Sequence, residues 1–188
     1  MLVSHSLQTD EELIAAACIH GDRTSLDALI RRHLPQVRRA VFQMVLDDTA
    51  ADDVTQEVFM RAIRGLKGFD RRAKFSTWLF RISMNAARTH LEKASRVRIA
   101  DHREAFDALP DKSPGPEGRL SIVELNDDIE QALAELPPSL RASLVLTTLE
   151  SLSPTEAAEI EGCSTSTMYW RIHEARKKLR HRLKEHLS

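Results

Sequence analysis

The stretch from residue 152 to 183 constrains the fold most, because it predicts two short helices joined by a tight turn. Ser153 and Glu156 frame a start signal for the first helix: a capping hydroxyl, a proline directly after it, and a carboxylate three residues after the cap. Gly162 permits the positive φ that ends this helix, and Ser164 can cap the second one. The pattern is that of a helix-turn-helix, a unit that binds DNA in some proteins and only packs in others.

The second helix of this motif combines an apolar stripe with a polar and aromatic opposite side. Its apolar residues recur at spacings of four, three and four, as one buried helix face requires: Met168, Ile172, Ala175 and Leu179. The residues that fall outside this stripe are Thr165, Ser166, Tyr169, Trp170, His173 and Lys177. Between residues 163 and 188, seven Lys and Arg stand against two acids, so duplex DNA is the expected partner. A second interpretation of Trp170 stays open, namely burial against Leu152 or a neighbouring helix.

A second basic segment, residues 69–98, holds eight Lys and Arg against two acids. It begins with a loop bounded by Phe69 and Phe75, and Ser76 is predicted to cap the helix that follows. One side of that helix carries Arg81, Asn85, Arg88 and Glu92. Aromatic rings that stack on bases, interleaved with cations that follow phosphates, suit single-stranded nucleic acid. Phe75 and Trp78 have the alternative interpretation of core residues.

Ahead of this segment the sequence predicts further helices. Thr9 and Glu12 form a capping box for the first, and Asp22 caps the second. Pro35 marks either a short break or the first turn of another helical piece. After a polar turn at 47–49, the helix expected over 52–66 has an apolar face made of Val54, Val58, Phe59, Ala62, Ile63 and Leu66. Its opposite face carries Asp53, Gln56, Glu57, Arg61 and Arg64, a pattern that also fits a plain solvated surface.

Composition favours an all-α chain built of two small helical domains. Of the 188 residues 42% are hydrophobic, Gly and Pro are sparse, and no alternating strand pattern is found. We expect a first domain over 1–95, a flexible acidic linker over 96–120, and a second domain over 121–188. Residues 101–135 hold ten acids against three bases, so the net charge of −1 hides two basic surfaces. These acids could shield the basic surfaces in the free protein.

Several classes of site are missing from the sequence pattern. Cys18 and Cys163 stand apart without CxxC spacing, and the eight histidines form no HxxxH or HExxH pattern. No cluster of carboxylates or histidines has the fixed spacing that catalysis needs. The N-terminus lacks a basic segment followed by a long apolar core, and no apolar run reaches membrane-spanning length. We therefore expect a cytoplasmic protein without cofactor, metal, membrane insertion or enzymatic activity.

Two stretches of the chain resemble one family. The segment DDVTQEVFMRAIRGLKGFDRRAKFSTWLFRISMNAARTHL is similar to the second domain of an extracytoplasmic-function (ECF) sigma factor of the sigma-70 family. The segment LAELPPSLRASLVLTTLESLSPTEAAEIEGCSTSTMYWRIHEARKKLRHRL is similar to the fourth domain. The motifs DxxQExFxRA, FxTWLFRIxxN, LPxxxR and ARxxLRxxL occur in the family's order. The resemblance covers nearly the whole chain from about Asp10, and it leaves no room for the first and third domains of housekeeping sigma factors.

The resemblance implies a role for each of three sets of residues. The clamp helices of the polymerase β′ subunit would be met by Asp53, Gln56, Glu57, Phe59 and Arg61. The opened −10 promoter element, with a base flipped into the loop, would be held by Phe69, Arg71, Arg72, Lys74, Phe75, Ser76, Arg81, Asn85 and Arg88. The major groove of the −35 element would be entered by Ser164, Thr165, Ser166, Thr167, Tyr169, Trp170, Arg171, His173, Glu174 and Lys177. Many relatives have polar or basic residues where this chain has Tyr169, Trp170 and Glu174, so the −35 sequence stays open.

Three functions compete on this basis. The resemblance favours an ECF-type sigma factor that binds core RNA polymerase through the β′ clamp helices and the β flap, recognises −35 and −10 promoter DNA, and promotes melting. An anti-sigma factor would hold it inactive. The alternative is a transcriptional regulator that uses only the C-terminal helix-turn-helix, with an N-terminal sensor or dimerisation domain. An all-α enzyme would need a deep pocket with convergent acids.

Overall fold

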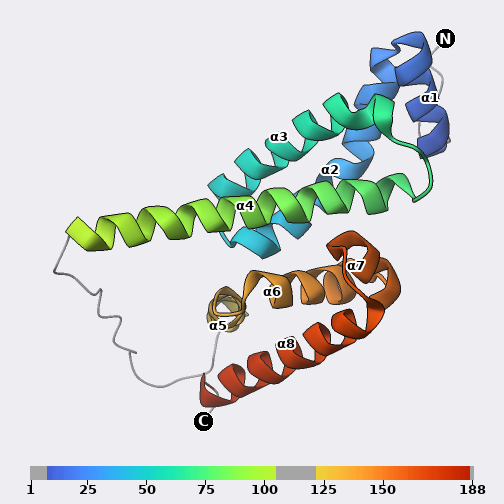
Figure 1. Cartoon of the computed structure of the whole chain (residues 1–188). Helices are drawn as coiled ribbons and strands as arrows, with labels where there is room; N and C mark the ends of the chain where they lie inside the picture. Colours follow the sequence, from blue (N-terminus) through green and yellow to red (C-terminus); the bar gives the residue numbers. More distant parts are fainter. Residues whose placement is uncertain (1–7, 105–121, 187–188) are drawn as a thin grey trace.

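The computed structural model of the chain describes residues 8–104 and 122–186, which are all-α as predicted (Figure 1). The first unit consists of α1 (Asp10–His20), α2 (Arg23–Val45), α3 (Asp48–Gly65), the 3₁₀ turn η2 (Leu66–Gly68) and α4 (Phe75–Glu104). The second consists of α5 (Ile122–Ala134), α6 (Pro138–Leu144), the π-helical turn η3 (Val145–Leu149), α7 (Pro154–Glu161) and α8 (Thr165–His186). None of the described helices is long and apolar enough to cross a membrane.

The helix ends follow the local signals in the sequence. Thr9 and Ser153 both complete capping boxes, at the starts of α1 and α7, as predicted. Gly21 and Gly162 end these two helices at φ 64° and 61°, in the left-handed region that a side chain resists. Ser164 caps α8, because its hydroxyl accepts a hydrogen bond from the Thr167 amide at 3.1 Å.

Two predicted boundaries were wrong. Pro35 neither breaks nor starts a helix, since α2 runs unbroken through it from Arg23 to Val45. The buried side chains on both sides of the proline hold α2 against its neighbours, and this packing outweighs one missing hydrogen bond. Ser76 is not a cap, because α4 already begins at Phe75 and the Trp78 amide donates to the Lys74 carbonyl. The linker predicted over 96–120 lies for the most part outside the described residues, and α4 continues to Glu104.

The carboxylate of Asp22 starts α2 and makes stability depend on pH. It accepts hydrogen bonds from the Ser25 hydroxyl at 2.5 Å and from the hydroxyl and amide of Thr24 at 2.7 and 3.0 Å. These bonds, that from Ser25 above all, favour the charged form and lower the pKa of Asp22 from 3.8 to about 2. A pKa lowered by folding stabilises the protein above the unfolded value, and this contribution disappears as the pH falls through the folded value.

We therefore expect Asp22→Asn, which keeps a capping side chain but cannot titrate, to lose less stability than the wild type when the pH falls from about 5 to about 2. Urea unfolding followed by circular dichroism at several pH values measures the difference. The matched control is Asp27→Asn, which removes an exposed carboxylate on the same helix. Identical pH dependence of Asp22→Asn and the wild type would contradict the assignment.

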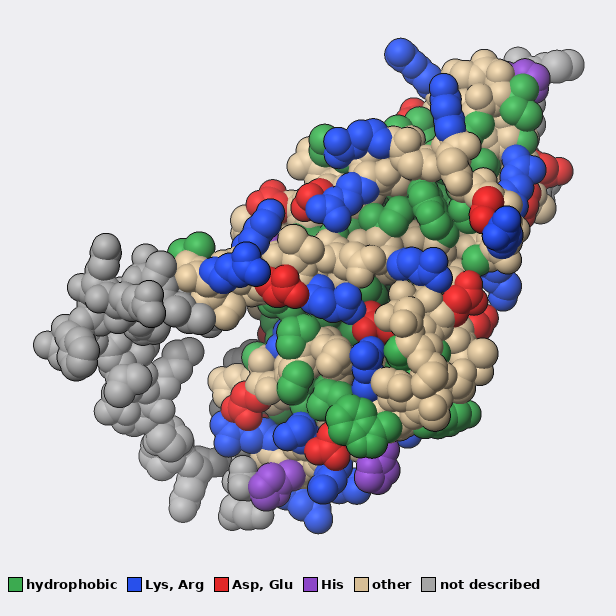
Figure 2. Space-filling model, in the orientation of Figure 1, with side chains coloured by type: hydrophobic (Ala, Val, Ile, Leu, Met, Phe, Trp, Pro, Cys, Tyr) green, Lys and Arg blue, Asp and Glu red, His purple; other side chains and the backbone are tan. Residues whose placement is uncertain are grey.

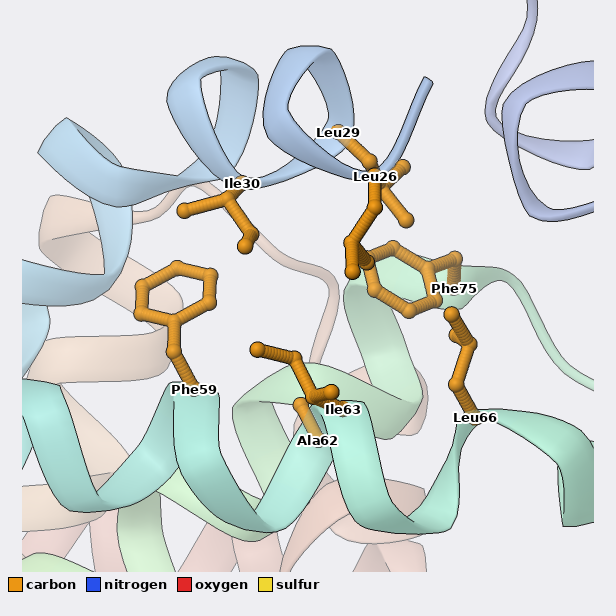
Figure 3. A pocket seen from close by; sticks show the side chains of 8 residues that line it. All are labelled: Leu26, Leu29, Ile30, Phe59, Ala62, Ile63, Leu66 and Phe75. Carbon is orange, nitrogen blue, oxygen red and sulfur yellow. The ribbon is translucent and has the colours of Figure 1, made fainter. Parts of the chain in front are cut away.

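The core of the first unit is built from α2, α3 and α4, which pack pairwise. Figure 3 shows the side chains that line a small apolar hollow between α2 and α3. Its lining residues are Leu26, Leu29, Ile30, Phe59, Ala62, Ile63, Leu66 and Phe75. Phe75 is 5% exposed, so it closes the core at the point where α4 begins. This placement fixes the loop that precedes α4.

The two units pack on each other, with α6, η3 and α7 lying against α4 and α2 (Figure 1). Val145 and Leu146 belong to the same buried cluster as Val41 and Met44. Arg141, of the LPxxxR motif, is buried and donates hydrogen bonds to the carbonyls of Met44 and Ala134, at 2.5 and 2.7 Å. The first of these carbonyls belongs to the last turn of α2, where a cation is favoured by the helix dipole.

Candidate nucleic-acid interface

A row of basic residues follows one side of α4. Lys74 precedes the helix, and Arg81 and Arg88 follow at intervals of seven residues, which is about two helical turns. Asn85 is exposed between the two arginines, and its side-chain oxygen accepts a hydrogen bond from Arg88 at 3.1 Å. The structure thus places on one side of α4 the cations and the amide that the sequence predicted for an opened strand.

The loop before α4 rests on a cluster of three aromatic rings. The rings of Phe69, Phe75 and Trp78 lie with centroids 5.2 to 5.8 Å apart. Phe75 is buried, whereas Phe69 and Trp78 are half-buried and pack at the edge of the core. Phe75 can therefore act on DNA only by supporting the loop, while Phe69 retains a partly open side. Ser76 is half-buried in the first turn of α4.

Two arginines project from the tip of this loop. Arg71 adopts a positive φ of 60°, which is uncommon for a residue other than glycine, and its side chain is exposed. Arg72 is exposed as well, and its guanidinium lies 3.2 Å from the Asp70 carboxylate. The Asp70 side chain also accepts a hydrogen bond from the Arg72 amide at 3.1 Å, a short-range bond that shapes the turn. The loop is thus a formed basic turn.

The second helix of the helix-turn-helix, α8, presents two large aromatic side chains to solvent. Met168, Ile172 and Ala175 are buried as predicted, while Tyr169 and Trp170 are 58% and 60% exposed. Burial of Trp170 against Leu152 is thereby excluded. The other predicted contact residues are exposed (Ser164, Ser166, His173 and Lys177) or half-buried (Thr165, Thr167, Arg171 and Glu174). Arg176 and Arg180 lie beside Tyr169, His173 and Lys177, so this side of α8 is a basic and aromatic surface.

A groove between α2 and α3 is lined by two of the five residues predicted to dock on polymerase, Gln56 and Phe59. Asp53, Gln56 and Glu57 are exposed, and Glu57 pairs with Arg61 at 2.6 Å one helical turn later. Phe59 is 8% exposed and lies at the floor of the groove. Asp53, Glu57 and Arg61 follow one another at intervals of one helical turn and do not line the groove, so the structure does not bring all five residues together.

The sequence did not predict the apolar strip of this groove, which is formed by Leu34, Met60 and Ile63. Ile63 was predicted on the buried face of its helix, yet it is 42% exposed, because no described residue covers the outer edge of the groove. Leu34 and Met60 join it, at 40% and 51% exposure, so the groove has an uncovered apolar wall. The signal in the sequence would have been the width of the apolar stripe on α3, which exceeds what packing on one face of a helix requires.

Comparison with known proteins decides the family. The protein-family model of sigma-70 region 2 matches residues 29–97, and the protein-family model of sigma-70 region 4 matches residues 126–179. The RNA polymerase sigma-H factor of Pseudomonas aeruginosa is 30% identical over 177 residues, covering 90% of this chain and 91% of its own length. The chain belongs to the sigma-70 family, as an ECF sigma factor. The ECF RNA polymerase sigma factor SigE of Mycolicibacterium smegmatis is 33% identical over 171 residues, which cover 89% of this sigma factor but 66% of that relative.

Two solved structures share the arrangement of this sigma factor. CnrH in complex with the cytosolic domain of CnrY has a TM-score of 0.66 and 27% identity, covering 94% of this chain and 99% of that one. RpoE of Bartonella quintana, in complex with the anti-sigma factor NepR, also has a TM-score of 0.66, with 25% identity and coverage of 85% and 96%. The fold of the sigma factor is therefore shared with two proteins that were solved in complex with a partner.

A second apolar groove of the sigma factor lies between α5, η3 and α8. It is lined mainly by Ile129, Leu133, Leu144, Val145, Leu149 and Leu179, with Gln43 of α2 at one edge. Leu149 is 43% exposed, so this groove too has an uncovered apolar wall. Of these leucines, the helical spacing of the sequence had placed Leu179 on the buried stripe of its helix, and it is half-buried.

Proposed function

We propose that the chain binds core RNA polymerase, recognises −35 and −10 promoter elements, and promotes strand separation at the −10 element. The observation that carries the proposal is the basic row of α4 beside a formed aromatic loop, on the same chain as a helix-turn-helix with an exposed recognition helix. Family membership supports the same roles. The polymerase carries out the chemistry, so the sigma factor itself is not an enzyme.

For the −10 element, Arg81 and Arg88 would hold phosphates of the opened strand, while Phe69 and Asn85 would meet an unstacked base. Opening and flipping a base costs a few kcal/mol, and stacking on an aromatic ring returns about 1 to 3 kcal/mol. For the −35 element, α8 would enter the major groove, where Tyr169 and Trp170 suit thymine methyl groups and Glu174 suits a cytosine amino group.

For polymerase, we propose that the groove between α2 and α3 receives the β′ clamp helices and that the groove between α5, η3 and α8 receives the β flap. Uncovered apolar side chains support both assignments, since they gain most from a helical partner. An anti-sigma factor is proposed as a further partner, supported by the NepR complex of the related RpoE. A protein with these partners works in the cytoplasm. The proposed domain limits remain 1–95 and 121–188.

Run-off transcription with purified core polymerase tests the proposal directly. We expect specific transcripts only when the sigma factor is added, from promoters mapped after its overexpression. The control is the sigma factor with promoter DNA but without core, which should leave no strong footprint. Strong operator footprints by the protein alone, without transcription by core, would instead establish the helix-turn-helix regulator.

A further inference from the structure

One carboxylate joins arginines of both proposed DNA-binding surfaces. The two oxygens of Glu161, at the end of α7, lie 2.7 Å from the Arg88 guanidinium and 3.1 Å from that of Arg171. Its side chain is 2% exposed, so the charge is almost fully removed from water. A buried carboxylate is stable only when it is paired, and Glu161 has two cations. The pairing engages one cation of each DNA surface.

The rest of α7 continues this match along α4. Glu156 lies 3.6 Å from the Lys74 ammonium, and the carbonyl of Glu159 accepts a hydrogen bond from Arg81 at 2.8 Å. Hydrogen bonds from Ser153 and the nearby Lys74 lower the pKa of Glu156, which keeps it charged. Each member of the basic row thus meets an anionic or carbonyl oxygen of α7. Figure 2 shows basic and acidic side chains next to one another where the first unit meets the second.

A further ion pair, which lies outside the proposed DNA surfaces, also joins the two units. Arg39 of α2 donates two hydrogen bonds to the carboxylate of Glu150, at 3.1 and 3.0 Å, and the Glu150 side chain is fully buried. This bidentate geometry is the strong form of the pair, and it raises the pKa of Arg39. Arg39 belongs to no proposed DNA or polymerase contact. A substitution of Arg39 therefore tests the packing of the two units and none of those contacts.

We propose that the free sigma factor closes on itself, with α7 lying where the opened −10 strand would lie, so that its acids occupy Lys74, Arg81 and Arg88. This inference rests on the proposed role of α4 in strand binding. A guanidinium that is bonded to Glu161 cannot bind a phosphate in the same direction, so the strand binds only the opened form. The apparent dissociation constant rises as the fraction of opened molecules falls.

Closure leaves most of α8 accessible. Tyr169, Trp170, His173 and Lys177 remain exposed in the closed arrangement, and Arg171 alone among the −35 residues is held by Glu161. The closed form therefore engages Arg88 most closely and Arg81 and Lys74 more loosely, since their side chains are 29%, 46% and 78% exposed. Separation of the two units exposes α4 and leaves Glu161 with one arginine instead of two.

Two substitutions of opposite charge test the closure. Glu161→Gln removes a negative charge and Arg39→Gln a positive one, yet each breaks a contact between the units. We expect both to tighten binding of a short fluorescent DNA single strand of mixed sequence by about three- to tenfold and to increase the radius of gyration in X-ray scattering. The charge-matched controls are Asp27→Asn and Arg31→Gln, both exposed on α2, which should leave the radius unchanged.

Arg39→Gln is the decisive variant, because simple electrostatics predicts weaker binding to DNA when a cation is lost. Arg39 lies on α2, outside the helix-turn-helix. Because its removal leaves the Glu150 carboxylate unpaired, thermal melts of every variant check folding. An unchanged radius together with unchanged or weaker strand binding by Arg39→Gln would overturn the closure. Absence of strand binding by every variant, with a larger radius for Glu161→Gln and Arg39→Gln, would instead refute the proposed role of α4 and leave closure standing.

Discussion

Replacing Arg81 and Arg88 together by alanine should slow open-complex formation about a hundredfold or more, while core polymerase is bound as before. A hydrogen bond between charged groups contributes about 1.5 to 3 kcal/mol, so the loss of two costs about 3 kcal/mol or more. Each 1.4 kcal/mol changes an equilibrium about tenfold, which gives the hundredfold effect. The same variant also loses contacts with α7, so relief of closure offsets part of the loss without changing its sign.

The salt dependence of strand binding distinguishes phosphate contacts by these two arginines from a purely structural role. Each phosphate contact to a single strand contributes about 0.7 to the slope of log K against log salt, so two lost contacts should lower the slope by about 1.4. Strand-binding titrations at several salt concentrations measure it. The control is Arg23→Ala with Arg31→Ala, which removes two exposed arginines from α2. If Arg81→Ala/Arg88→Ala melts promoters at the wild-type rate with an unchanged slope, the two arginines serve only to pack α4 against α7.

The parts of the fold that the sequence predicted are those determined within a few residues. Capping boxes at Thr9 and Ser153 and the glycine ends of α1 and α7 depend on side chains three or four positions apart. The continuity of α2 through Pro35 depends instead on packing against other helices, which no local pattern contains. For the same reason α4 begins at Phe75 and not after the predicted cap Ser76, since Phe75 is buried in the core.

The candidate site divides in the same way. Helical spacing predicted the exposed side of α8 and the basic row of α4, because a repeat of three or four residues sets which side chains share a face. It could not predict that Arg88 meets Glu161, 73 residues away, or that Arg39 meets Glu150, 111 residues away. Shielding of the basic surfaces by acids was expected from residues 101–135, and that remains a prediction. The acids found against α4 are those of α7.

The apolar strip of the α2–α3 groove gives the second large effect. Replacing both Met60 and Ile63 by glutamate should weaken binding to core polymerase about a hundredfold or more, because full burial of an apolar side chain contributes about 1.5 to 3 kcal/mol. A carboxylate forced into the same contact adds a desolvation cost. Both side chains are about half exposed in the free protein, at 51% and 42%. Because Ile63 also lines the small apolar hollow between α2 and α3, we expect some loss of stability, smaller than the loss of core binding.

The matched control for this strip is Ile19→Glu, since Ile19 is 72% exposed on α1 and does not line the groove. Competition with unlabelled protein for fluorescent core polymerase measures the affinities, and thermal melts verify folding. Strand binding by free Met60→Glu/Ile63→Glu should not fall beyond the effect of two added negative charges, because the groove lies on α2 and α3 rather than on the basic side of α4. Wild-type affinity for core in this variant would show that the clamp helices dock elsewhere, and that the exposed strip awaits another partner.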